Sequence, residues 1–145
     1  MAGVPESTMA FPAAYQVAAP FGADIGGVSP AFFAIANNDA FGYAEFDSWL
    51  TIGVTDGSAP GAISASPGFD IASQWTATTP LLQTDGAIFF MDPGTMGANS
   101  GSDPIVMAQM TLSADDAASG TATAKLQGRN AVSYTHLTLP TIYSV

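Results

Sequence analysis

The sequence predicts a single all-β domain, an antiparallel β-sandwich or jelly roll. Several short segments alternate apolar and polar residues with the two-residue period of a strand that buries one face. Fifteen Gly and ten Pro among 145 residues interrupt the chain often, which leaves room only for short helices. Because 48% of the residues are apolar, a chain of this length can bury a core of its own.

The clearest predicted strand is the segment 45–54. Its even positions form the predicted buried face, and its odd positions are predicted to point away from the core: Glu45, Asp47, Trp49 and Thr51.

The other predicted strands are shorter or less regular, and they cover residues 14–18, 31–35, 69–75, 87–91, 105–112 and 121–127. Residues 87–91 are apolar on both faces, which indicates a central strand covered on each side. Turn-forming pairs such as Asp56-Gly57 and Asp85-Gly86 separate the strands. Helices of one or two turns are expected only near residues 37–41 or 114–118.

The charge is strongly unbalanced. The chain has twelve carboxylate side chains but only two Lys or Arg residues, Lys125 and Arg129, which gives a formal net charge of −10. We therefore expect no nucleic acid as a partner, and anionic membrane surfaces are disfavoured, because both are bound through Lys and Arg. No apolar run is long enough to span a bilayer, so we expect no membrane insertion. The chain has no Cys, which excludes disulfides and thiolate chemistry.

The two ends of the chain differ from its middle. Residues 1–10 show neither the basic region nor the apolar core of a signal peptide. They are predicted to be a linker or the start of a fragment, because the opening Ala-Gly-Val-Pro-Glu-Ser-Thr resembles a linker that leads into a strand. Residues 11–131 are the predicted domain. Residues 132–141, Val-Ser-Tyr-Thr-His-Leu-Thr-Leu-Pro-Thr, resemble the translation of a sequencing-library adapter, so residues 132–145 are interpreted as an artefactual tail.

A genuine terminal strand is the alternative interpretation of this tail. The tail holds His136, the only His. If the tail is foreign, the natural part has neither His nor Cys, and the domain is truncated before its last strand.

Three segments carry a resemblance to known proteins: Phe46-Asp-Ser-Trp-Leu-Thr-Ile-Gly53, Asp85-Gly-Ala-Ile-Phe-Phe90 and Val106-Met-Ala-Gln-Met-Thr-Leu112. Residues 11–129 resemble β-rich modules of large exported or cell-surface proteins. The resemblance implies an extracellular or cell-surface location and neighbouring modules in a longer chain. It implies no reaction, because its motifs are core patterns.

Calcium is the cation that the acidic loops favour. Ca²⁺ takes six to eight oxygen ligands from carboxylates, amides and carbonyls, and loops at one end of a sandwich can supply them together. The candidate ligands are Asn37, Asp39, Asp92, Asn99 and Asp103. Asp and Asn also favour turns without any metal. The alternative is therefore that these residues only form turns and that the protein binds no cofactor.

One predicted strand face carries residues suited to sugar binding. Trp49 would stack on a sugar ring while Glu45 and Asp47 bind its hydroxyl groups. The alternative is that Trp49 packs in the core. Glu45 and Asp47 also form a candidate acid pair for glycoside hydrolysis.

Taken together, these patterns favour a non-enzymatic extracellular module, with no catalytic residues, that has a structural or adhesive role in a larger secreted or surface protein. Its expected partners are neighbouring modules or surface glycans. A carbohydrate-binding module, with or without Ca²⁺, is the second hypothesis, and an acid-pair glycoside hydrolase is the third.

Overall fold

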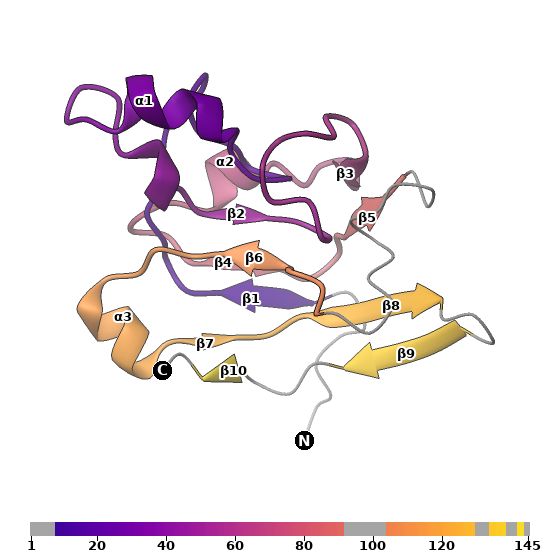
Figure 1. Cartoon of the computed structure of the whole chain (residues 1–145). Helices are drawn as coiled ribbons and strands as arrows, with labels where there is room; N and C mark the ends of the chain where they lie inside the picture. The colour runs from indigo at the N-terminus through magenta and orange to yellow at the C-terminus, as the bar shows by residue number, and fades with distance from the viewer. Residues whose placement is uncertain (1–7, 92–103, 130–133, 139–141, 144–145) are drawn as a thin grey trace.

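The computed structural model describes residues 8–91, 104–129, 134–138 and 142–143 and has a β-rich fold with short helical segments (Figure 1). The strands are β1 (Met9–Phe11), β2 (Trp49–Leu50), β3 (Ile63–Ala65), β4 (Leu81–Gln83), β5 (Ile88–Phe90), β6 (Ala108–Gln109), β7 (Thr121–Ala122), β8 (Lys125–Arg129), β9 (Tyr134–Thr138) and β10 (Ile142–Tyr143). The helical segments are η1 (Pro30–Phe32), α1 (Phe33–Ala36), η2 (Ala44–Phe46), α2 (Ile71–Gln74) and α3 (Ala114–Ser119).

All the strand pairs in this part of the chain are antiparallel, and they join β1 to β4, β2 to β6, β3 to β5, β7 to β10 and β8 to β9. A bridge between Ala10 and Thr123 links β1 to the end of β7. The strands β4, β1, β7 and β10 therefore follow one another across the molecule (Figure 1).

The main core lies between two of these strand pairs. Leu50 of β2 and Leu81 of β4 pack in one buried cluster with Phe69, Ile71 and Trp75, and residues of β1 and β6 cover its edge. The Trp75 ring is fully buried, and its Nε1 atom donates a hydrogen bond to the Pro12 carbonyl at 2.7 Å. The one polar atom of this large ring is therefore satisfied inside the core.

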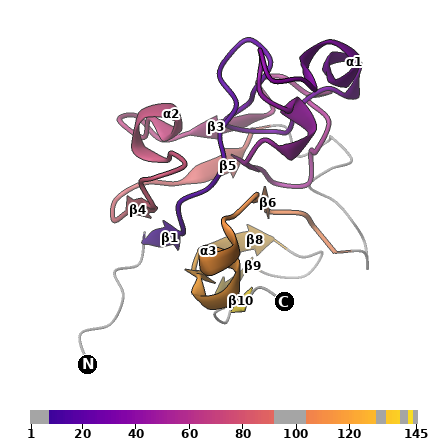
Figure 2. The ribbon, with the colours of Figure 1, turned by 90° about the vertical axis from the view of Figure 1, so that its left-hand side faces the viewer.

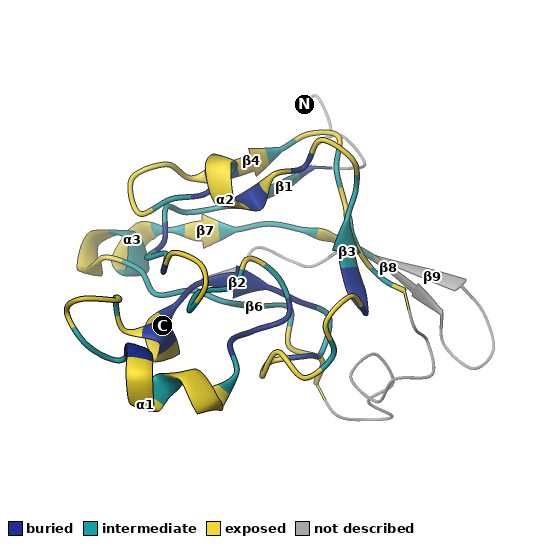
Figure 3. Cartoon of the chain, turned by 90° about the horizontal axis from the view of Figure 1, so that it is seen from above, coloured by how far each residue is buried: buried dark blue, intermediate teal, exposed yellow. Residues whose placement is uncertain are grey.

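A second, smaller core supports the helical segments between η1 and η2. It contains Val28, Ala36, Ala44 and Trp49, with Phe21 and Phe33 partly buried against it. In Figures 1 and 2, α1 lies at the top of the molecule and α3 at the bottom, with strands between them. Seen from above in Figure 3, α1 and its neighbouring turns form an exposed edge beside buried β2.

Capping side chains explain why two predicted strands are helical. Residues 31–35 form η1 and most of α1, because Ser29 caps the first turn and Pro30 stands at its first position. Residues 69–75 contain α2, whose first turn is capped by the carboxylate of Asp70 through a bond from Ser73 N. The expected short helix at 114–118 is confirmed as α3, capped by Ser113.

Other predicted strands are wrong or shorter than expected. In the segment 45–54 only Trp49–Leu50 is a strand, and in 105–112 only Ala108–Gln109. Residues 14–18 form no strand. The first strand, β1, lies earlier in the sequence, at Met9–Phe11. Residues 87–91 do contain β5, which pairs with β3 and with no other strand of the described residues. Phe89 and Met91 are exposed, so the segment is not buried on both faces as predicted.

The C-terminal residues also take part in strand pairing. In the described part of the tail, β9 pairs with β8 and β10 pairs with β7, and residue 136 stands opposite residue 127. The origin of the tail stays a prediction, because a strand-forming pattern there was the alternative interpretation of the same residues.

Two adjacent leucines of β4 test the position of the core. Leu81 is 1% exposed, whereas Leu82 is 66% exposed. We expect Leu81→Ala to lower the free energy of unfolding by about 2–5 kcal/mol, because it leaves a cavity in the core. Leu82→Ala is the matched control and should change it by less than about 0.5 kcal/mol. Urea denaturation of both variants measures this, and equal destabilisation by the two would contradict the assigned faces of β4.

Candidate functional site

The carboxylate of Asp47 is fully buried and joins segments that are distant in the sequence. Its Oδ1 atom accepts hydrogen bonds from Val17 N at 2.7 Å and from Ser48 N at 2.9 Å. Its Oδ2 atom accepts from Ala23 N at 2.7 Å. The loop 17–23 is thus held at both ends by one side chain.

Gly22 shows how closely this loop is packed. A Cβ atom added at Gly22 would overlap the Val17 carbonyl and approach Asp47 Oδ2 to 3.0 Å. Any side chain at this position would therefore force the loop away from the carboxylate.

Burial changes the acidity of Asp47. Loss of solvent raises the pKa of its carboxyl to about 6, although the bonds from Ala23, Val17 and Ser48 act to lower it. The nearby charge of Asp24 raises it further. Burial and the charge of Asp70 in turn raise the pKa of Asp24. Asp24 therefore lies within electrostatic range of two other carboxylates.

The segment that carries Asp47 is fastened on its other side to β6. Gln109 Nε2 donates to the Asp47 carbonyl at 2.7 Å and to the Glu45 carbonyl at 3.0 Å. Ser48 Oγ accepts from Thr111 N at 3.0 Å. Side chains and backbone together fix residues 45–48 between the loop 17–23 and β6.

The predicted outward face of residues 45–54 is confirmed at Glu45, which is exposed, and is wrong at the other three positions. Asp47 is 0% exposed, Trp49 is 4% exposed and Thr51 is also buried, whereas Phe46, predicted to be buried, is 49% exposed. There are two physical reasons. The 3₁₀ turn η2 replaces the first part of the predicted strand, and residues 47–51 are all buried, so both faces of the chain are covered there.

The three residues predicted to bind a sugar do not form a common surface. Trp49 packs against the small core beneath η1 and η2, so it presents no ring face to a ligand. Glu45 is exposed on η2, while both oxygens of Asp47 face backbone amides. The structure therefore does not bring Glu45, Asp47 and Trp49 together on one accessible face, and Glu45 and Asp47 do not form an accessible acid pair.

Large apolar side chains are exposed around the helical segments instead. Phe32, Ile35, Phe41, Tyr43 and Phe46 are between 39% and 58% exposed. We call these five residues the η1–η2 surface. Their backbone is supported from below by buried Ala36, Ala44 and Trp49. Figure 3 shows this exposed edge around α1.

Ring contacts organise the η1–η2 surface. Phe21 lies 5.9 Å from Phe32 and 4.9 Å from Phe41, measured between ring centroids, and Tyr43 lies 6.5 Å from Phe46. The Tyr43 hydroxyl donates to Asp39 Oδ1 at 2.8 Å, and this bond raises the pKa of Tyr43. Phe21, at the end of the loop held by Asp47, thus connects that loop to the surface.

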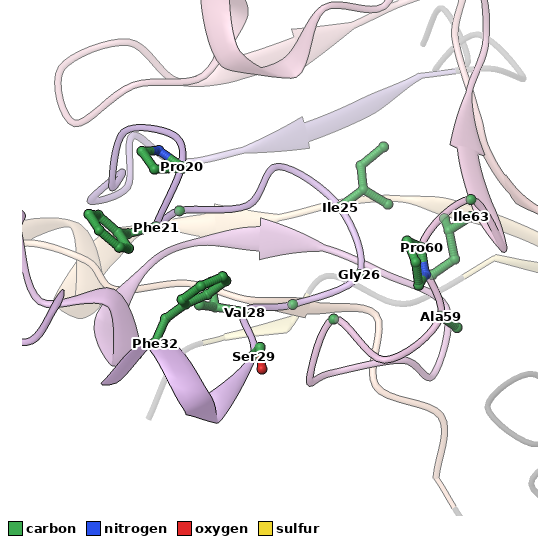
Figure 4. Close-up of a pocket in the computed structure, with 14 residues that line it drawn as sticks. Pro20, Phe21, Ile25, Gly26, Val28, Ser29, Phe32, Ala59, Pro60 and Ile63 are labelled. Atoms are coloured by element: carbon green, nitrogen blue, oxygen red, sulfur yellow. The ribbon is translucent and has the colours of Figure 1, made fainter. Parts of the chain in front are cut away.

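A groove of about 240 Å³ adjoins this surface (Figure 4). Phe21 and Phe32 lie at one end, Pro60 and Ile63 lie at the other, and the chain from Gly26 to Val28 runs between them. Its lining is mainly apolar and glycine-rich, with Ser29 as the one side-chain hydroxyl.

The residues predicted to bind calcium fall into two groups. Asp92, Asn99 and Asp103 lie outside the described residues. Asn37 Oδ1 accepts from Glu45 N at 3.1 Å, and Asp39 bonds Tyr43, so both side chains hold local turns. Within the described ranges, no three His, Asp or Glu side chains are grouped so that they could hold a metal ion.

Sequence reasoning missed both the η1–η2 surface and the groove. The signal that identifies the helical turn is Ser29-Pro30, an N-cap followed by Pro, ahead of the apolar run. The groove has no such local signal, because residues 20–32 and 57–63 meet there only in the folded chain.

Comparison of the chain with family models, with curated proteins and with solved structures finds no match. None of the helices in the described ranges has the length and apolar character needed to cross a bilayer.

Removing the Asp47 carboxylate tests its structural role. We expect Asp47→Ala to lower the free energy of unfolding by about 3–5 kcal/mol, because buried amide groups lose their only charged acceptor. Asp85→Ala, at an exposed turn position, is the control and should stay within about 0.5 kcal/mol of wild type. Chemical denaturation of both variants checks this, and a mild effect of Asp47→Ala would show that the loop is held by other contacts.

The raised pKa of Asp47 also predicts a pH dependence. The folded state binds the proton more tightly than the unfolded state, whose Asp pKa lies near 3.8. Stability from this group is therefore fully present below pH 4 and is lost as the pH rises through about 6. The loss should be on the order of 2 kcal/mol, and it should be absent in Asp47→Asn but retained in Asp85→Asn. Urea unfolding from pH 4 to pH 7 measures it, and parallel curves for wild type and Asp47→Asn would refute it.

Proposed function

We propose that this chain is a non-enzymatic structural or adhesive module of a larger exported or cell-surface protein, built as a β-sandwich. The shared core of the pairs β1–β4 and β2–β6 supports the sandwich, because their side chains meet in one buried cluster. The acidic composition suits a module that stays soluble at an exposed location. The resemblance of residues 11–129 to surface-protein modules supports export.

The observation that carries the adhesive role is the η1–η2 surface. Five large apolar side chains stay exposed within one short stretch of the chain, although burying each would be favourable. Grouped exposed apolar residues mark interaction surfaces in soluble proteins. Buried Ala36, Ala44 and Trp49 hold the backbone beneath them, so a partner meets an ordered surface.

Carbohydrate binding is the second candidate, and Tyr43 is the observation that favours it. Its ring is 40% exposed and its hydroxyl bonds Asp39, so an aromatic face and a carboxylate stand side by side. This is the combination that sugar recognition uses, with stacking on the ring and hydrogen bonds to the carboxylate. Calcium dependence of this binding stays part of the proposal, with Asn37 and Asp39 as the described candidate ligands.

Binding to arrays of immobilised extracellular proteins and glycans tests both candidates. We expect wild type to bind array spots, Ile35→Ser/Phe46→Ser to lose at least about tenfold in affinity, and Leu82→Ser to bind like wild type. Leu82 is the control because it is exposed on β4, outside the η1–η2 surface.

The kind of spot separates the two candidates. Protein spots support the adhesive role, whereas glycan spots that weaken in Tyr43→Ser, which removes the stacking ring, support carbohydrate binding. Duplicate arrays with Ca²⁺ and with EDTA show whether the metal takes part. Binding that survives Ile35→Ser/Phe46→Ser, or no binding to any spot, would contradict the proposal.

A further inference from the structure

The groove beside the η1–η2 surface has the size of a side-chain site. Its volume of about 240 Å³ lies below the roughly 300–1,000 Å³ typical of pockets for small molecules and cofactors. Phe21, Phe32, Pro60 and Ile63 give it apolar ends (Figure 4). It therefore suits one or two apolar side chains of a peptide better than a cofactor.

Glycines keep part of the groove open. A Cβ atom added at Gly26 or at Gly61 would meet no other atom within 4 Å, and both residues line the groove. The backbone of a bound peptide can therefore approach the wall closely at these two places.

Two carboxylates adjoin the lining residues. Asp24 precedes Ile25, Asp56 precedes Gly57, and both aspartates are exposed. Asp56 lies opposite Gly27 in a bridge, which fixes it beside the groove. The whole chain has twelve carboxylates but only two residues of the Lys and Arg type, Lys125 and Arg129. The net charge of −10 therefore favours a partner that brings cations to the neighbourhood of this groove.

We propose that this groove binds an exposed segment of a partner protein in which an apolar side chain stands beside a Lys or Arg. The apolar side chain enters between Phe32 and Ile63, and the cation lies against Asp24 and Asp56. The inference rests on the proposed function, because it assumes a module that works by contact, and it adds the chemistry of the partner. A second copy of the chain fits less well, because each copy carries a net charge of −10.

Selection from a phage-displayed random heptapeptide library, at low salt on the full chain, identifies the preferred chemistry. We expect enriched peptides to combine Leu, Ile, Phe or Pro with a neighbouring Lys or Arg. With an enriched peptide, ¹⁵N-resolved NMR should show shifts at the amides of Gly26, Gly27, Gly57 and Gly61, which line or adjoin the groove.

A pair of double variants separates local from general charge effects. Asp24→Asn/Asp56→Asn should weaken the enriched peptide about tenfold, whereas Asp85→Asn/Asp115→Asn should weaken it less than about twofold. Both remove two charges, but Asp85 and Asp115 do not adjoin the groove. Asn at position 56 keeps the oxygen that accepts from Ser58 N, so the turn stays intact.

Several outcomes would overturn the inference: no enrichment, enriched peptides without Lys or Arg, equal weakening by both double variants, or NMR shifts away from the groove. Concentration-dependent shifts of the same glycines without peptide would assign the groove to a second copy instead. Failure here with intact array binding removes this inference alone. Loss of array binding with successful peptide selection removes only the proposed role of the η1–η2 surface.

Discussion

One buried carboxylate, that of Asp47, is the interaction on which the arrangement of this protein depends. It accepts backbone hydrogen bonds from both ends of the loop 17–23, while its own segment is fastened to β6 through Gln109 and Ser48. The position of Phe21 follows from this loop, and Phe21 in turn contacts Phe32 and Phe41. Asp47 therefore influences both the η1–η2 surface and the groove, because it holds the loop that carries Phe21.

The acidic composition explains why backbone amides surround this carboxylate. A buried charge needs compensation, and the chain offers only two basic side chains for twelve acidic ones. Backbone N–H groups supply hydrogen bonds without a counter-ion, but they offset the loss of water only in part, so the pKa of Asp47 stays above its usual value. The same shortage of cations is the reason why we propose a partner that brings a Lys or Arg to the groove.

How much of the fold the sequence predicts depends on the range of the interactions involved. β5, α3 and the strand character of 121–127 were predictable, because alternation, apolar runs and the Ser113 cap are local signals. The segment 45–54 was predicted wrongly because Asp47 is buried by partners 24 and 30 residues away, which no local pattern displays. The helices at 31–35 and 69–75 could have been found from Ser29-Pro30 and Asp70, whose capping roles compete with the strand pattern.

The candidate site was less predictable than the fold. Glu45, Asp47 and Trp49 were grouped by a strand period that η2 interrupts, so their side chains separate into exposed and buried positions. Other aromatic residues in the same part of the sequence, Tyr43 and Phe46, are exposed, whereas Trp49 is buried. Their exposure follows from the turn that Asp47 stabilises, which is a tertiary effect.

The titration of the Asp47 carboxyl carbon by ¹³C NMR tests this account most directly. If burial and three backbone amides set the environment of the carboxylate, its signal should titrate near pH 6, and the Val17 and Ala23 amide signals should move with the same midpoint. A midpoint near that of exposed aspartates, with the two amides unchanged, would show that the carboxylate does not hold the loop.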